Sequence, residues 1–271
     1  MSLNQLLTKK IESLPPLPDT IIKIQEVCNN PESSAKDLVE IVERDPLLTA
    51  NLLRVANSPY YGFTSKITSV AHAISLFGMT TVLGFALSSA VRKNFKDIDL
   101  SPYQITTEDF SLSCYRQNKL MINWHFYLKV KNANILVPAS FVNEIGKVVL
   151  AEIISEKGLT ERFAAELKKA RNYFEVEKNF LNITTPEVSG KILYRWRIEP
   201  NVVYAILSSL QPETAEEPLR TYGYAIKICR TVIGEKGLVT KETIGEAVKL
   251  LEEAGLEKDN FLTSLRKTFK S

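Results

Sequence analysis

Helical periodicity constrains the fold of this chain more than any other feature of its sequence. Apolar residues recur at spacings of three and four along nearly the whole chain, and no convincing run alternates apolar and polar positions as a half-buried strand would. No segment repeats at a fixed period, so a solenoid of stacked repeats is not indicated. The sequence therefore predicts an all-α protein, a two-lobed helical bundle.

Helix start and stop signals outline a first lobe, at about residues 11–98. Leu14-Pro15-Pro16-Leu17-Pro18 predicts an extended turn, because proline fixes its own φ and biases the preceding residue away from the helix. Residues 95–105 lack periodicity, so we expect a lobe boundary near residue 100. The helices expected in this lobe lie at about 20–28, from Ser33 or Ser34 to Arg44, from Asp45-Pro46 to about Asn57, and at about 70–76 and 80–92.

The second half is predicted to be a helical lobe at about 105–210, followed by C-terminal helices at 211–271 that pack on it. Thr185-Pro186 and Thr240 are helix-start signals within this half. The helices expected here lie at about 107–131, 133–156, 160–179, 186–197, 200–210, 217–234, 240–254 and 258–269.

Charge and composition exclude several classes of function. A formal net charge of +3 is too small to indicate nucleic-acid binding, which needs basic residues clustered on one face. The three cysteines are far apart and show no CxxC spacing, so neither a disulfide framework nor a zinc site is indicated. Lys9-Lys10 precedes any long apolar run, and the longest such run, Val82–Val91, is far shorter than the ~20 residues that span a bilayer. We expect a cytoplasmic protein without a membrane segment.

Two stretches of the first lobe carry a resemblance to a known family. Leu14-Pro-Pro-Leu-Pro18 is followed by Asp37-Leu-Val-Glu-Ile-Val-Glu-Arg-Asp-Pro-Leu-Leu-Thr-Ala-Asn-Leu-Leu-Arg-Val-Ala-Asn-Ser-Pro-Tyr-Tyr-Gly62 and by Ile67-Thr-Ser-Val-Ala-His-Ala-Ile-Ser-Leu-Phe-Gly78. This pattern resembles the HDOD family of bacterial signalling domains. The resemblance covers roughly residues 11–210 and is weaker in the second half, where it rests on Ser140–Leu150, on Glu187-Val-Ser-Gly190 and on Tyr194-Arg-Trp196.

The resemblance implies an HD-domain-like second lobe and a non-catalytic or output role in signal transduction and gene regulation. Many family members retain a His-Asp pair where this chain has Asn143-Glu144, and Pro186 stands where a histidine often begins the Glu-Val-Gly segment. A divalent metal in such a site needs imidazole nitrogens and carboxylate oxygens that converge, and the chain has two histidines, His72 and His125. We therefore expect no enzyme activity, no metal and no cofactor.

Two interpretations of the degenerate HD position stay open. Glu144 and Lys147 are three residues apart and can form an ion pair on one helix face. Alternatively, His125, Asn143, Glu144 and Lys147 line a relic pocket that offers hydrogen bonds to a nucleotide. His125 has a structural role in the first interpretation. The competing class of function is a divergent metal-dependent phosphohydrolase of the HD superfamily, acting on a nucleotide or cyclic dinucleotide, in which His125, Glu144 and further carboxylates hold the metal.

A second candidate site is the aromatic turn that follows the helix ending near Asn57. Tyr60 and Tyr61, with Asn57, Arg44 and Arg54 nearby, form a possible surface for an unknown protein partner of a signalling pathway. The structural alternative is that Asn57 ends the helix in the left-handed conformation and a packed turn follows.

Overall fold

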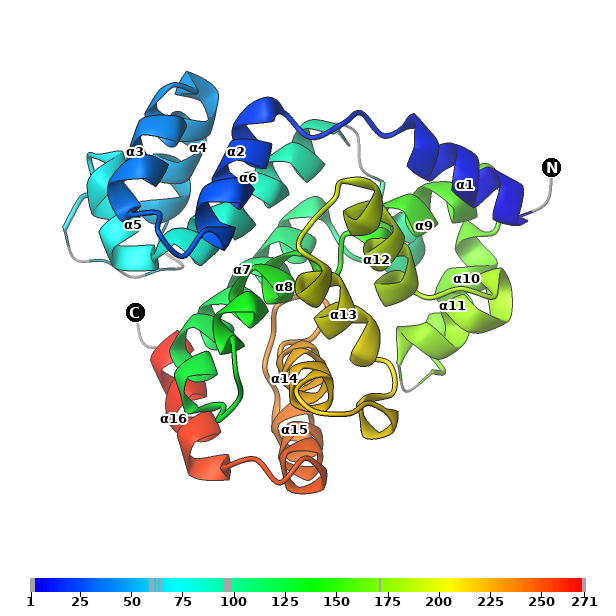
Figure 1. The fold of residues 1–271 in the computed structure, drawn as a ribbon. Helices are drawn as coiled ribbons and strands as arrows, with labels where there is room; N and C mark the ends of the chain where they lie inside the picture. The colour runs from blue at the N-terminus through cyan, green and yellow to red at the C-terminus, as the bar shows by residue number, and fades with distance from the viewer. Residues whose placement is uncertain are drawn as a thin grey trace.

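The computed structural model describes residues 3–58, 61, 63, 65–94, 99–170 and 172–269. The described residues form α-helices joined by turns and short 3-10 segments, with no strand among them (Figure 1). This confirms the all-α prediction. It follows from the periodicity, since each helix buries its apolar stripe against its neighbours.

The described part of the first lobe is helical, and several of its helices begin at recognisable side-chain caps. The Ser34 side chain and Asp37 cap each other's backbone amides at the start of α3, and Asp45 accepts a hydrogen bond from Leu48 N at the start of α4. The helices are α2 (Asp19–Asn29), α3 (Ala35–Glu43), α4 (Pro46–Ala56), α5 (Val70–Phe77) and α6 (Met79–Asn94).

The second half of the chain folds around α8, which lies between several other helices. α8 packs against α6 of the first lobe and against α7, α13 and α14. The helices of this half are α7 (Thr107–Trp124), α8 (Leu136–Val142), α9 (Gly146–Glu156), α10 (Thr160–Leu167), α11 (Tyr173–Leu181), α12 (Thr185–Arg195), α13 (Pro200–Ser208), α14 (Leu219–Val232), α15 (Lys241–Glu253) and α16 (Lys258–Phe269).

Three of the long helices predicted for this half were wrong in extent. The first ends at Trp124 and continues as a 3-10 turn, His125–Tyr127. The second breaks between α8 and α9, where Ile145 N and Lys147 N donate to the carbonyls of Val142 and Glu144, three residues back. The third breaks before α11, whose first turn is capped by Asn172. Periodicity continues across each break because the helices on both sides bury apolar residues.

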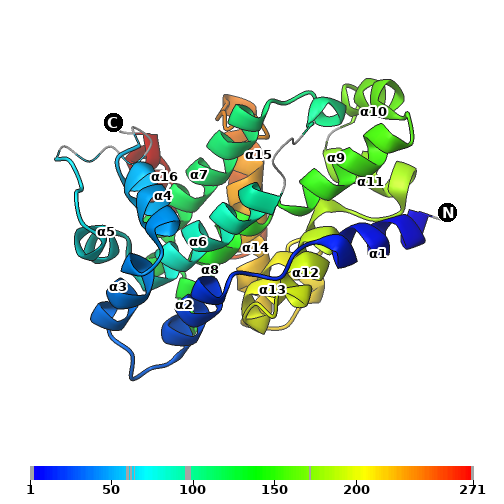
Figure 2. The ribbon, with the colours of Figure 1, turned by 90° about the horizontal axis from the view of Figure 1, so that it is seen from above.

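An N-terminal helix that the periodicity did not predict, α1 (Leu3–Ser13), packs on α9 and α12 of the second lobe (Figures 1 and 2). Lys10 forms ion pairs with Glu152 and Glu156 on α9. The proline-rich segment then crosses to the first lobe. Trp196 Nε1 donates to Pro15 O at 3.1 Å, and Arg195 donates to Leu14 O at 3.3 Å, so this segment is attached to the end of α12.

The two lobes share one continuous core. A Cβ atom on Gly84 of α6 would lie 3.3 Å from Cα of Pro138 in α8, and the rings of Phe85 and Phe141 are 5.4 Å apart. At the other side, the Trp124 and Phe261 rings join α7 to α16 with centroids 5.0 Å apart. The boundary near residue 100 is therefore a contact between packed helices.

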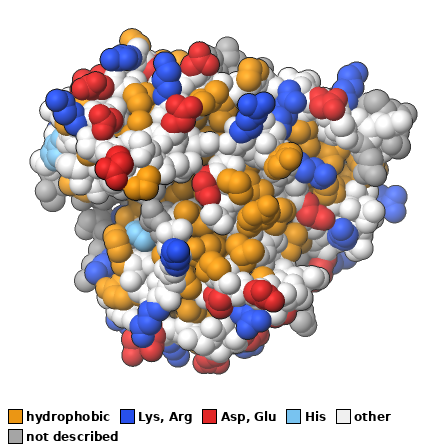
Figure 3. All heavy atoms as spheres, viewed as in Figure 1, with side chains coloured by type: hydrophobic (Ala, Val, Ile, Leu, Met, Phe, Trp, Pro, Cys, Tyr) orange, Lys and Arg blue, Asp and Glu red, His pale blue; other side chains and the backbone are white. Residues whose placement is uncertain are grey.

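Hydrophobic side chains also reach the surface. Figure 3 shows them gathered across the middle of one face, over α12 and α13. Tyr194 on α12 is 80% exposed and Tyr204 on α13 is 52% exposed. Among the described residues no single helix has the length and apolar composition to cross a bilayer; α5 and part of α6, Val70–Phe77 with Met79–Leu87, meet that test only together, and they are bent by 109°.

Candidate functional site

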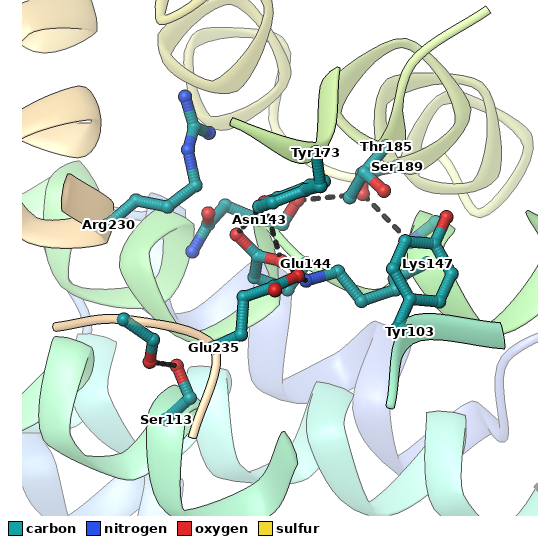
Figure 4. A network of polar contacts seen from close by, with 12 residues as sticks. Tyr103, Ser113, Asn143, Glu144, Lys147, Tyr173, Thr185, Ser189, Arg230 and Glu235 are labelled. Carbon is teal, nitrogen blue, oxygen red and sulfur yellow. Dashed lines mark hydrogen bonds and ion pairs between the residues drawn. The ribbon is translucent and has the colours of Figure 1, made fainter. Parts of the chain in front are cut away.

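Asn143-Glu144, the position at which the family resemblance leads one to expect a His-Asp pair, lies at the turn between α8 and α9, inside the second lobe. Asn143, Glu144 and Lys147 are all buried there, and Figure 4 shows them with the side chains that surround them. The three residues come together because the turn places Asn143 and Glu144 at the end of α8 while Lys147 lies on the first turn of α9.

Lys147 is the cation at the centre of this site. Its Nζ lies 2.9 Å from Glu144 Oε2 and 2.8 Å from Glu235 Oε1. The ammonium also lies over the ring of Tyr173, 3.8 Å from the centroid, with the Tyr103 ring at 5.1 Å. Burial alone would lower the pKa of Lys147, but the two carboxylates outweigh it and raise that pKa above its usual value. Lys147 is therefore charged.

Glu144 is the buried anion of the pair. The hydroxyl of Tyr173 donates to Oε1 at 2.7 Å and lies 2.9 Å from Oε2. Burial would raise the pKa of Glu144, but the charges of Lys147 and Arg230 and the Tyr173 hydrogen bond lower it below the usual range. The ion pair that the spacing of Glu144 and Lys147 allowed is thus present, with both partners ionised.

Glu235, the second partner of Lys147, comes from the loop between α14 and α15. Ser113 Oγ on α7 donates to Gly234 O at 3.0 Å, and Arg116 donates to Gly237 O at 2.7 Å, so α7 holds this loop over the site. Sequence reasoning missed Glu235, because 88 residues separate it from Lys147 and no local pattern links the two.

Asn143 connects the turn to its neighbours. Its Nδ2 donates to Gln117 Oε1 at 2.9 Å and to Ser140 O at 2.8 Å, while Oδ1 has no hydrogen-bond partner within the described part of the chain. Ser189 Oγ on α12 donates to Asn143 O at 2.8 Å and accepts from Gly146 N at 2.8 Å. The two weaker family motifs of the second half therefore contact each other at this point.

Gly146 permits that contact. A Cβ atom there would lie 2.4 Å from the carbonyl oxygen of Thr185 and 2.6 Å from Ser189 N, both on α12. Only glycine lets the backbones of α9 and α12 approach so closely.

Glu177 is a second buried carboxyl group beside the network. It accepts hydrogen bonds from Tyr103 Oη at 2.7 Å, from Thr185 N at 2.6 Å and from Thr185 Oγ1 at 2.5 Å. Burial raises the pKa of Glu177 to about 7, because the hydrogen bonds and the more distant Lys147 charge offset the desolvation only in part. The sequence carried no signal for this residue.

His125 is not part of this group. It begins the 3-10 turn after α7, where its Nδ1 lies 3.0 Å from Met121 O, and burial lowers its pKa. Eight helical residues separate it from Gln117, which contacts Asn143, and that is a distance of about 12 Å along α7. Among the described residues no group of three or more His, Cys, Asp or Glu side chains is placed to hold a metal ion.

The aromatic turn of the first lobe is divided between core and surface. Tyr61 is buried, with its ring 4.9 Å from Phe77, so it is not available to a partner. Arg44 and Arg54 are exposed, and Tyr60 lies outside the described residues. Asn57 ends α4 at φ −87° rather than in the left-handed conformation, because its side chain exchanges hydrogen bonds with the backbone of Ile67.

A cavity of about 430 Å³ opens beside the network. Glu144, Tyr173, Glu235, Arg230 and Gln117 contribute to its wall. Of the four residues that the sequence suggested for a relic pocket, Glu144 lies on this wall, whereas His125, Asn143 and Lys147 are not among the residues that line it.

Known proteins share this arrangement of helices. A crystal structure of a virulence factor from Campylobacter jejuni is 29% identical, covers 100% of this chain and 98% of its own, and has a TM-score of 0.57. A candidate phosphohydrolase from Shewanella amazonensis has 19% identity, 97% and 94% coverage and a TM-score of 0.73. A candidate signal transduction protein from Marinobacter aquaeolei has 20% identity, 99% and 66% coverage and a TM-score of 0.68.

A longer relative and a family model complete the comparison. The chain is 20% identical over 236 residues to an uncharacterized protein from Treponema pallidum, and it spans 44% of that protein's length. The model of the HDOD domain matches residues 14–212, which is most of the chain. The protein therefore belongs to the HDOD family.

Proposed function

We propose that this protein is a non-catalytic module of signal transduction or regulation, which acts by binding a protein partner or a small ligand. The observation that carries the proposal is the position of Lys147, whose ammonium group lies between Glu144 and Glu235 in the degenerate HD site. The Lys147 ammonium group thus pairs with the carboxylates that a metal ion would need as ligands.

The donor chemistry supports the same conclusion. Metal-assisted hydrolysis needs an open coordination position on an ion held by imidazole and carboxylate ligands. Here the Asn143 amide nitrogen donates to Gln117 and Ser140, and the Glu144 carboxylate accepts from Tyr173 in addition to its ion pair. The Asn143 nitrogen and the Glu144 carboxylate are thus already engaged, and Asn143 Oδ1 is the atom left without a partner among the described residues.

A divergent phosphohydrolase is the second candidate. The observation in its favour is the cavity beside Glu144, together with the fold shared with the Shewanella candidate phosphohydrolase. Metal binding at this position would require Glu144 and Glu235 to break their ion pairs with Lys147. The buried ammonium group would then be unpaired, at a cost of several kcal/mol.

Elemental analysis and phosphoesterase assays test the proposal. Protein purified without chelator or affinity tag is compared with the variants Glu144→Ala and Lys147→Met, and each is assayed on cyclic and linear phosphoesters with added Mn²⁺ or Mg²⁺. We expect wild-type protein to contain no stoichiometric metal and to hydrolyse nothing. Stoichiometric transition metal that is lost in Glu144→Ala, accompanied by hydrolysis in the wild type, would overturn the proposal.

A further inference from the structure

Arg230 is a buried cation whose charge lowers the pKa of Glu144, although no ion pair joins the two residues. It lies on α14, is 8% exposed, and its guanidinium lies over the ring of Phe174 at 4.4 Å from the centroid. Figure 4 shows the guanidinium pointing away from Lys147 and Glu144. Its one hydrogen bond to a described residue is from Nη1 to Ser209 Oγ, at 3.2 Å.

The guanidinium is therefore short of acceptors. It carries five N–H donors in a planar fork, and Ser209 accepts from one nitrogen. None of the ion pairs formed within the described ranges includes Arg230. Buried charges in proteins are ordinarily paired, because removing an ion from water is costly unless an opposite charge and hydrogen bonds replace the water.

The free donors face open space. Arg230 lines the 430 Å³ cavity beside Glu144 and also a neighbouring cavity of about 1020 Å³. Asn172, Phe174, Thr231 and Glu246 belong to both walls, so the two cavities adjoin at Arg230. Volumes of this order suit a small organic ligand.

Further cations lie around the same space. Lys168 and Lys236 are on the wall of the smaller cavity, and Lys178, Lys227 and Lys249 are on the wall of the larger one. Carboxylates are present as well: Glu144 and Glu235 share the single charge of Lys147, Glu187 caps Thr184 at the start of α12, and Glu246 lies on both walls. Glu175 and Glu253 are on the wall of the larger cavity. Arg230 is the buried one among these cations, and it forms no ion pair with a described residue.

We propose that Arg230 binds the oxyanion of a small organic ligand, a phosphate or a carboxylate, at the junction of the two cavities. A planar guanidinium matches either group with two parallel hydrogen bonds. Phe174 fixes the plane of the fork from one side, and Ser209 fixes one nitrogen. The assignment rests on the proposed function only in taking binding as the purpose of the cavity.

Calorimetric titration of the full chain tests the assignment. The probes are inorganic phosphate, adenosine 5′-monophosphate and succinate, with adenosine as the uncharged comparison. The variants are Arg230→Met, which keeps the stack on Phe174, and Arg230→Lys, which keeps the charge and removes the fork. The matched control is Arg220→Met, the same substitution on the same helix at an exposed position.

We expect at least one anionic probe to bind in a 1:1 ratio and adenosine to bind less tightly. For the anionic probe that binds, the dissociation constant is expected to rise at least tenfold in Arg230→Met and by a smaller factor in Arg230→Lys. It is expected to stay within twofold in Arg220→Met. Tighter binding of the phosphates than of succinate, or the reverse, identifies the oxyanion.

Two results would overturn the assignment: no binding of any anionic probe to wild-type protein at about 10 mM, or equal binding by Arg230→Met. Thermal unfolding shows whether each variant is folded. Hydrolysis of a bound phosphate probe would contradict the proposed function and leave the Arg230 assignment standing.

Discussion

At the scale of single residues, the loss of stability caused by a substitution at Lys147 depends on whether Glu144 remains as a buried, unpaired carboxylate. Lys147→Met would keep the volume and leave Glu144 as a buried carboxylate with only Tyr173 as a hydrogen-bond donor. Breaking a buried pair in this way costs roughly 3–5 kcal/mol. We expect a loss of that size in the free energy of unfolding, measured by urea denaturation.

An exposed pair supplies the control for that measurement. Lys169 and Glu166 form an ion pair with the same spacing, but their side chains are 69% and 45% exposed. Lys169→Met is expected to change stability by less than about 1 kcal/mol. Equal effects at Lys147 and Lys169 would contradict the ionised, buried pair described here.

Glu177 makes the stability of the protein depend on pH. Burial raises its pKa from the usual 4.5 to about 7 in the fold, so the folded state favours the protonated carboxyl group. The stabilisation is present in full below pH 4.5 and is lost as pH rises through about 7, by roughly 3 kcal/mol in total.

Glu177→Gln is expected to remove that dependence. Its amide oxygen can accept from Thr185 N and its NH2 group can donate to the hydroxyls of Tyr103 and Thr185, whereas the protonated carboxyl group has one O–H to donate. The stability of the variant relative to wild type should therefore increase between pH 4.5 and 7, as measured by urea unfolding at several pH values. A stability difference between variant and wild type that does not vary with pH would show that the fold does not raise the pKa of Glu177.

The sequence predicted one contact of this site and missed the others for a physical reason. Glu144 and Lys147 are local, so helical spacing brings them together. Glu177 comes from α11, Arg230 from α14 and Glu235 from the loop after α14. Their positions at the site depend on how those helices pack. A single sequence carries no record of such packing.

At the scale of helices, the contact between α9 and α12 depends on Gly146. Gly146→Ala would place a methyl group against the backbone of Thr185 and Ser189, which cannot move without shifting α12. Overpacking of this kind is expected to cost about 3 kcal/mol. Thermal and urea unfolding measure the loss.

Gly245, in the exposed part of α15, provides the opposite case. A Cβ atom there would meet nothing within 4 Å. Gly245→Ala is expected to stabilise the protein by roughly 0.5–1 kcal/mol, because alanine loses less backbone freedom than glycine when a helix forms. If both substitutions were destabilising to the same degree, the close approach at Gly146 would not be the cause.

Helix starts were easier to predict than helix breaks. Ser34 and Asp45 predict the starts of α3 and α4, because a cap is formed by residues adjacent to the helix in sequence. The break between α8 and α9 instead depends on Ser189 of α12, which donates to one side of the turn and accepts from the other. The apolar pattern continues through that turn, so periodicity alone predicted one helix.

At the scale of the whole molecule, the last three helices belong to the core although the family model ends at residue 212. Ile228 and Leu251 are fully buried, Phe261 packs on Trp124, and Glu235 pairs with Lys147. A chain that ends at residue 210 would expose the faces of α7, α8 and α13 on which α14 and α16 pack.

Truncation at residue 210 is therefore expected to abolish cooperative unfolding. The measurements are urea denaturation followed by circular dichroism and binding of a dye that detects exposed apolar surface. A truncated chain that unfolds in one sharp transition with the stability of the full chain would show that α14–α16 are an accessory to the core rather than part of it.

The position of α1 has a consequence for how the protein is made. Lys10 leaves the ribosome well before its partner Glu152, which is 142 residues further along the chain. At about 5–20 residues per second, α1 waits on the order of ten seconds before α9 has been synthesised. During that interval α1 lacks the surface of α9 that covers it in the fold, so its apolar side chains are open to a chaperone that shields such segments during synthesis.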